Sequence, residues 1–278
     1  MEWFVEPFEL GFQQRALLGG VLAALMASTV GTWLVLRGMS FFGDAFVHGV
    51  VPGVAAAVVL DINPLLGAAV AAAVMVAAIE LVQRKTVLGE DTSIGLLFVG
   101  MLALGVVIIS RMDSYSGSLT SILFGDALGV TTADIFGQLI VLGVVLIVSL
   151  LLYRPLVALS LSRDKAELLG MRPRVAHAAL LILIALAVIG SYQSVGTLLV
   201  FGLLVGPPAT ASLLTGTIRS MMIVAGAIGI FSVWAGLVLS YHWGIAASAT
   251  MALVPIVLFF VVLSLQSLLR STRQPVSA

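Results

Sequence analysis

Long apolar segments recur along almost the entire chain, and this pattern constrains the fold more than any other feature. They occupy residues 15–36, 41–60, 65–84, 94–111, 134–153, 174–191, 195–215, 221–240 and 244–268. A helix needs about 20 residues to cross the roughly 30 Å hydrocarbon core of a bilayer. We therefore expect an all-α fold, a polytopic transmembrane helical bundle of about nine spans, in which residues 1–278 form a single membrane domain.

The composition supports this class and excludes several others. Of the 278 residues, 61% are hydrophobic and only 9% are charged, which does not suit a water-soluble domain of this length. The formal net charge is zero, so no basic surface suggests a nucleic-acid partner. Cysteine is absent, which excludes disulfides and thiolate metal ligands. The partner that the composition does predict is membrane lipid.

The basic residues favour one orientation of the nine spans. If the amino terminus lies outside and the carboxyl terminus is cytoplasmic, the inner loops hold eleven Lys or Arg residues and the outer loops hold two. The inner ones are Arg37, Arg84, Lys85, Arg154, Arg163, Lys165, Arg172, Arg174, Arg219, Arg270 and Arg273, and the outer ones are Arg15 and Arg111. This asymmetry satisfies the positive-inside rule, and an even number of spans would remove it.

The second apolar segment contains a carboxylate and an imidazole, Asp44 and His48, one helical turn apart. At this spacing both side chains point from the same face of a helix. Pro52 lacks an N–H, so we expect the His48 carbonyl to have no helical donor. Ionisable residues inside a span are costly and mark functional sites by default, so we interpret this turn as a passage site for a metal ion. The alternative is an internal salt bridge that only stabilises helix packing.

Two other stretches indicate moving or contacting parts. Gly206, Pro207 and Pro208 interrupt helical hydrogen bonding in the seventh segment, so together with Pro52 we interpret them as a hinge or gate, the alternative being a packing kink. We expect a short helix that ends at Gly170 within the inner connection 154–173. We interpret this helix as a contact for another protein, and the alternative is a connecting turn.

The remaining polar motifs are less informative. His177 is near the inner end of the sixth segment and His242 is in an outer loop, and both positions favour interface anchors over metal ligands. The chain has no G-x-x-x-x-G-K-[ST] phosphate-binding loop, so it cannot hydrolyse ATP alone. Energy for transport must come from a partner or from an ion gradient.

Several motifs resemble those of the integral-membrane permeases of the manganese/zinc/iron family of ATP-binding-cassette importers, the ABC-3 type. The similarity runs in order from about residue 12 to residue 268. The matching stretches are 34–40, 43–53, 90–95, 123–126, 164–170, 195–200 and 207–211. The chain departs from the family pattern at Val47, where Ser or Ala is common, and at Pro207-Pro208, where a single Pro is common.

The resemblance implies a fold similar to the vitamin B12-type (type II) importer permeases and a place in a bacterial plasma membrane. It implies a homodimer, two separate cytoplasmic ATP-binding-cassette subunits that bind the ATP, and an extracytoplasmic metal-binding protein that delivers the ion. Asp44 and His48 fall on the family's metal motif. The family's coupling helix, which contacts the ATPase, falls on Arg163, Asp164, Ala166, Glu167, Leu168 and Gly170.

We therefore expect a transport subunit with no permanently bound cofactor and no enzymatic activity of its own. Its transported ion would be Mn²⁺, Zn²⁺ or Fe²⁺, since carboxylate and imidazole suit all three. One alternative is a secondary metal/proton transporter that works without an ATPase. Another is a type II importer of chelated metal or vitamin, although such a cargo would not need ligands within the membrane.

Overall fold

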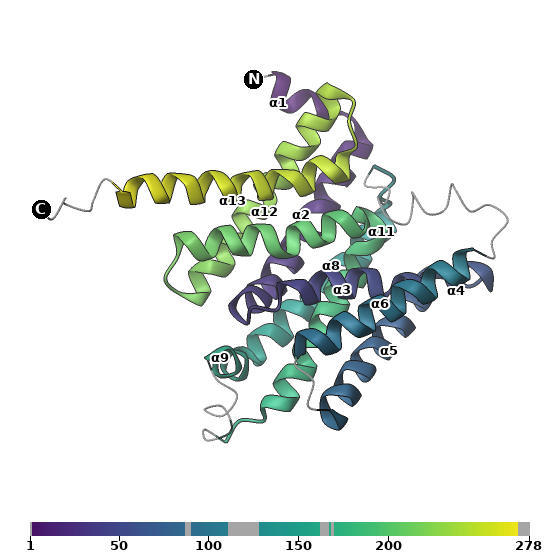
Figure 1. Ribbon diagram of the computed structural model, residues 1–278. Helices are drawn as coiled ribbons and strands as arrows, with labels where there is room; N and C mark the ends of the chain where they lie inside the picture. Colours follow the sequence, from purple (N-terminus) through teal and green to yellow (C-terminus); the bar gives the residue numbers. More distant parts are fainter. Residues whose placement is uncertain (1, 87–89, 111–127, 162–166, 168–169, 272–278) are drawn as a thin grey trace, which may run out of the picture.

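The computed structural model describes residues 2–86, 90–110, 128–161, 167 and 170–271. This part of the chain is helical and contains no strand (Figure 1). Its elements are α1 (Glu2–Val5), η1 (Glu6–Glu9), α2 (Gly11–Leu36), α3 (Ser40–Gly49), α4 (Val51–Val59), α5 (Pro64–Lys85), α6 (Glu90–Ile109), α8 (Thr132–Leu151), α9 (Tyr153–Leu161), α11 (Pro173–Leu214), α12 (Ile218–Trp243) and α13 (Ala247–Ser271).

Within the described residues, eight helical segments are long and apolar enough to cross a membrane. They are Gly11–Leu36, Ser40–Val59, Pro64–Lys85, Thr92–Ile109, Thr132–Leu151, Pro173–Ser191, Ile218–Trp243 and Ala247–Leu269. A shorter apolar helix, Leu199–Leu214, occupies the place of the seventh expected span. The all-α membrane bundle is thus confirmed, with every predicted segment matched by a helix whose ends differ by a few residues.

Local chemistry explains where several of these helices begin and end. The Asn63 side chain accepts the Leu65 N–H, which caps α5 just before Pro64. Thr131 and Asp134 form a reciprocal capping box at the start of α8. At the other end of α12, Gly244 takes the left-handed conformation (φ 63°) that commonly ends a helix.

Helix α2 lies at the centre of the bundle and packs against α8, α11 and α12. Glycines allow α2 and α12 to approach closely, because a Cβ atom at Gly20 would collide with Val233. At the opposite end of α2, the buried Trp33 donates from Nε1 to the Ser149 hydroxyl on α8 at 3.1 Å. The largest fully buried side chains, among them Trp33 and Phe46, form one core around α2 and α3.

Neighbouring contacts give the relative directions of the helices. Gly20 meets Val233 and Gly229 meets Ala24, so α2 and α12 are antiparallel. The second half of α11 runs parallel to α13, because Gly202 meets Ala252 and Gln266 donates to the Leu213 carbonyl. These directions are the ones that nine alternating crossings require.

Two of the expected spans are not straight helices throughout, because one is interrupted at Val50, near Pro52, and the other leaves the helical conformation at Gly196. The second span bends at Val50, which separates α3 from α4 instead of leaving one continuous helix. In α11 the interruption lies at Gly196, whose φ of 73° and ψ of 165° are not helical. Pro207 and Pro208 sit ten or more residues further on, inside a stretch that remains helical, so the backbone changes direction at Gly196.

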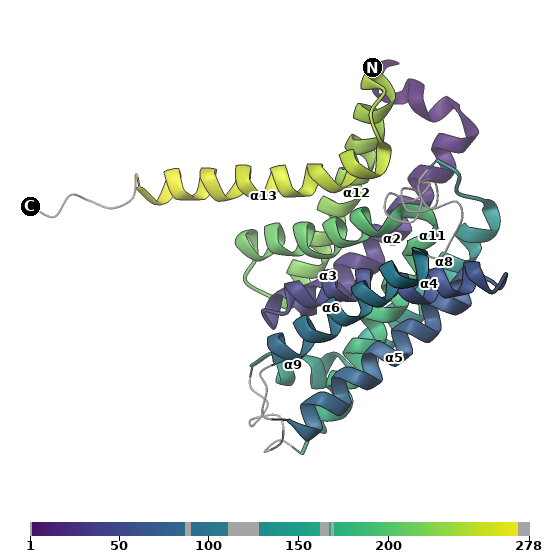
Figure 2. The same ribbon diagram turned by 45° about the vertical axis from the view of Figure 1, so that its right-hand side comes forward.

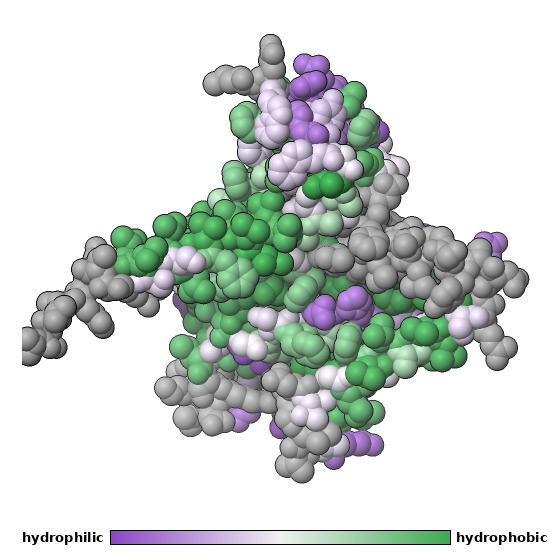
Figure 3. Space-filling view, turned by 45° about the horizontal axis from the view of Figure 1, so that its top comes forward, coloured by the Kyte–Doolittle hydropathy of each residue, from purple (hydrophilic) through white to green (hydrophobic). Residues whose placement is uncertain are grey.

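The outer surface of the bundle is largely hydrophobic, as Figure 3 shows, and a small hydrophilic patch interrupts it near the middle of this face. Helix α13 extends away from the other helices in both views (Figures 1 and 2). Its side chains Leu253, Phe260, Leu265 and Leu269 are exposed. Apolar side chains on such a surface are stable in contact with lipid or with another membrane-embedded chain.

Candidate functional site

Asp44 and His48 form the expected pair on one face of α3. His48 Nε2 lies 3.5 Å from Asp44 Oδ1, and the two side chains are each 29% exposed. Helix α3 is held between α6 and the second half of α11, so the pair belongs to the packed bundle and still reaches the surface. A carboxylate and an imidazole that share one open face offer two ligand atoms to a cation.

The His48 ring has one nitrogen left for a ligand. Its Nδ1 atom is buried and has no hydrogen-bond partner among the described residues. The ring packs at a 59° angle to Phe98 on α6, with 6.0 Å between the ring centroids. A buried nitrogen without a partner is costly, so a donor or metal ion that reached it through an opening of the packing would gain from it.

One copy of the chain supplies few ligands at this place. Within the ranges that the structure describes, no group of three or more His, Cys, Asp or Glu side chains could hold a metal ion together. Structural zinc sites use four ligands and Mn²⁺ prefers six, so two side chains make an incomplete site. Such a site would need water or a second chain to complete it.

The His48 carbonyl has no donor four residues on, as expected from Pro52, but another backbone N–H reaches it. Because the chain turns at Val50, the Val50 N–H bonds to the His48 carbonyl oxygen. Pro52 lies in the first turn of α4, where its missing N–H costs nothing. The carbonyl is therefore already hydrogen-bonded, and the candidate site consists of the two side chains.

The glycines around the pair let other helices approach closely. A Cβ atom at Gly49 would collide with the Met75 side chain on α5, and one at Gly53 would collide with the Gly67 backbone. Gly43 is next to Asp44 and packs against Leu204 of α11. A Cβ atom at Gly43 would lie only 2.6 Å from Cδ2 of Leu204. Gly49 and Gly53 thus allow the close helix packing that small residues permit between membrane helices.

Leu204 connects the tandem prolines with the candidate site. Pro208 has no N–H, so the Leu204 carbonyl lacks its usual helical donor. That carbonyl packs against Gly31 of α2, while the Leu204 side chain packs against Gly43. Gly206 in the same helix packs against Pro255 of α13. The hinge or gate at Gly206, Pro207 and Pro208 stays a prediction, and their helix contacts the turn that holds Asp44.

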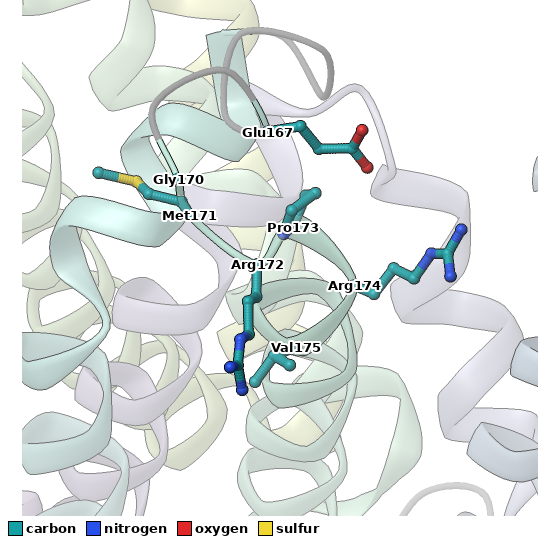
Figure 4. Close-up of a pocket in the computed structure, with 7 residues that line it drawn as sticks. All are labelled: Glu167, Gly170, Met171, Arg172, Pro173, Arg174 and Val175. Atoms are coloured by element: carbon teal, nitrogen blue, oxygen red, sulfur yellow. The ribbon is translucent and has the colours of Figure 1, made fainter.

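The expected protein contact at residues 163–170 is described only in part. Arg163, Asp164, Ala166 and Leu168 lie outside the described residues. Glu167 is exposed, and Gly170 closes a turn with φ 70° by donating to the Glu167 carbonyl. These two residues line an open cleft of about 590 Å³ together with Met171, Arg172, Pro173, Arg174 and Val175. In Figure 4 the Glu167 and Arg174 side chains extend to one side of the cleft and Arg172 extends away from both.

Sequence reasoning missed one buried polar contact. His177 was expected to anchor the chain at the membrane interface, but it is only 4% exposed. Arg37 Nη1 donates to His177 Nδ1 at 2.8 Å. The two residues are 140 positions apart, and no local pattern in the sequence pairs them. His242 does lie at an end of the bundle, where it stacks on Trp3 with 4.1 Å between the ring centroids.

Comparison with known proteins bears on the family and the fold of the chain. The ABC 3 transport family matches residues 9–266. The manganese transport system membrane protein MntC of Listeria innocua is 35% identical over 91% of this chain and 90% of its own length. A probable iron transport system membrane protein of Haemophilus influenzae is 30% identical, covering 95% of this chain and 97% of its own. The structure of PsaBC from Streptococcus pneumoniae in complex with Fab superposes with a TM-score of 0.82 at 31% identity, covering 93% of this chain and 94% of the other.

Proposed function

The chain belongs to the ABC 3 transport family, and on this premise we propose that it is the membrane permease of an ATP-driven importer of divalent transition-metal ions. Relatives that match about nine tenths of the chain carry manganese or iron transport in their names. The observation that carries the proposal is the Asp44–His48 pair with its partly exposed face and the unpaired His48 Nδ1.

The pair would hold the ion only in passing. Two side chains bind a dication weakly, and a transport site must release its ion as readily as it takes it up. A second copy of the chain across a two-fold axis would add another Asp44 and another His48. Four side-chain ligands, two from each copy, would then surround one ion, and separation of the two copies would release it.

Mn²⁺ is the first ion to test, and Fe²⁺ the second, because the relatives are named for these metals. The Irving–Williams order places both at the weak end of the divalent series. Zn²⁺ would bind the same carboxylate and imidazole more tightly. Selection against Zn²⁺ would therefore depend on geometry and metal supply and not on affinity.

The energy source would be a separate ATPase. The chain contains no phosphate-binding loop, so two cytoplasmic ATP-binding-cassette subunits would bind and hydrolyse the nucleotide. The cleft around Glu167 and Arg172 lies at the end of the expected coupling segment, where such a subunit would dock. This end would lie in the cytoplasm and the amino terminus outside, the orientation that the positive-inside count favours. A metal-binding protein would deliver the ion on that outer side.

Replacing both ligands tests the proposal directly. The D44A/H48A variant should lose uptake of radiolabelled Mn²⁺ in cells that lack their own copy of the chain, while its amount in the membrane stays unchanged. E80Q is a matched control, because Glu80 is also an acid on an apolar helix and pairs with Arg84 at 3.6 Å. Undiminished uptake by D44A/H48A would refute the proposed site. Uptake driven by a pH gradient in liposomes without any ATPase would instead support a secondary transporter.

A further inference from the structure

The Arg37–His177 contact has a defined charge state. Arg37 is the C-cap residue of α2, and its guanidinium donates to Nδ1 of the buried His177. A guanidinium has only donors, so Nδ1 must accept. The imidazole is therefore neutral in this contact and carries its proton on Nε2. The bond needs an acceptor at the δ position of residue 177 and a donor at the end of residue 37.

Arg37 is directly connected to the helix that carries Asp44. Gly38 takes the left-handed conformation with φ 68°, and the Met39 N–H bonds back to the Leu34 carbonyl at 2.9 Å. Helix α3 then begins at Ser40. This tight, hydrogen-bonded turn leaves no slack between the end of α2 and the start of α3. A displacement of Arg37 would therefore move the first turn of α3.

His177 lies one helical turn from the cleft at the end of the coupling segment. Helix α11 begins at Pro173, one helical turn before His177, and Pro173 lines the cleft in Figure 4. The Ala176 N–H bonds to the Arg172 carbonyl at 3.1 Å, so this first turn is regular. The turn thus presents cleft residues on one side and holds His177 in the protein interior on the other.

We propose that Arg37 and His177 are positioning residues that transmit movement of the coupling segment to the metal-binding helix. The proposal rests on the proposed function and adds a route by which the ATPase acts on the Asp44–His48 site. A partner that pushes on the cleft moves the first turn of α11. The hydrogen bond passes this movement to Arg37, and the tight turn at Gly38 passes it to α3.

Two substitutions at residue 177 separate the hydrogen bond from simple packing. In H177N the side-chain oxygen lies at the δ position and still accepts from Arg37, whereas H177L is of similar volume and has no acceptor. R37M removes the donor and keeps an unbranched stem. Each variant would be purified with its ATPase subunits in proteoliposomes, and the measurement is Mn²⁺ taken up per ATP hydrolysed. This ratio is independent of how much protein folds.

We expect H177L and R37M each to lower the uptake per ATP about tenfold, the effect of losing one hydrogen bond to a charged group. H177N should stay within about twofold of wild type. The double variant R37M/H177L should be no worse than either single variant, because both remove the same link. If H177L does not fold, R37M and H177N carry the test.

Wild-type coupling in H177L or R37M would overturn the proposal. So would an H177N variant that is as uncoupled as H177L, because its acceptor is retained. A wild-type complex that takes up no Mn²⁺ would refute the proposed function itself. Active wild-type and active H177L complexes would refute only the link between the cleft and α3.

Discussion

Substitution of Gly31 by alanine should disrupt the contact between α2 and the proline-containing half of α11. A Cβ atom at this position would lie 2.9 Å from the carbonyl carbon of Leu204, closer still to its oxygen, and 3.1 Å from Cγ of Pro208. Ordinary contacts begin at 3.4 Å, so the two helices would have to separate by roughly 1.5 Å to clear the Leu204 oxygen. The neighbouring atoms belong to backbone and to a proline ring, which cannot move aside as the end of a flexible side chain can.

Overpacking of this kind costs about 1–3 kcal/mol, and the rigid neighbours place G31A near the upper end. In soluble domains of 150–250 residues, 1 kcal/mol corresponds to about 2–4 °C in Tm, so we expect a loss of about 6–12 °C. The measurement is thermal unfolding of the detergent-solubilised protein, followed by loss of the monodisperse peak in size-exclusion chromatography.

G143A is the matched control for this prediction. Gly143 lies within α8, and a Cβ atom there would meet nothing within 4 Å among the described residues. Alanine favours helix over glycine, so G143A should leave Tm unchanged or raise it slightly. A G31A variant with the same Tm as G143A would refute the packing that we describe around Leu204. Reduced Mn²⁺ uptake in G31A is also expected, because Leu204 touches Gly43 beside Asp44.

Two further substitutions test the ends and breaks of helices. G196A should destabilise the protein by about 1–3 kcal/mol, because φ 73° with ψ 165° is accessible essentially only to glycine. The measurement is thermal unfolding, and a G196A variant with the wild-type Tm would contradict the described bend. T131A removes one half of the capping box of α8 and should cost about 1 kcal/mol by the same measurement, whereas T131S, which keeps the hydroxyl, should remain close to wild type. Equal Tm values for T131A and T131S would show that the cap contributes nothing.

The membrane bundle and the Asp44–His48 pair could be predicted because both depend on spacing along the chain. Apolar runs of about 20 residues define spans, and four residues define one helical turn. The pairing of Arg37 with His177 could not be predicted in this way. Its two residues end one helix and begin another, and only the packing of α2 against α11 brings them together. The sequence shows a histidine near a helix end, which by itself favours the interface.

The position of the break in α11 was also missed, for a physical reason. Prolines were expected to interrupt the seventh span, but a proline has the φ of a helix and removes only a hydrogen-bond donor. Pro207 and Pro208 remove two donors while the backbone around them stays helical, and this helix packs closely at Gly31 and Gly206. Glycine has no such restriction of φ, so Gly196 alone takes a conformation that redirects the chain.

This division of roles has a mechanical consequence. The helix that follows the bend, Leu199–Leu214, is continuous, so it can move as one body about Gly196. Leu204 lies eight residues from the bend, which corresponds to about 12 Å along a helix axis. A rotation of about 10° at Gly196 would therefore displace Leu204 by about 2 Å, enough to empty its contact at Gly43. Gly196 would then be the hinge, and the helix that contains the two prolines would rotate about it as a rigid body. The rotation would act on Gly43, the residue before Asp44.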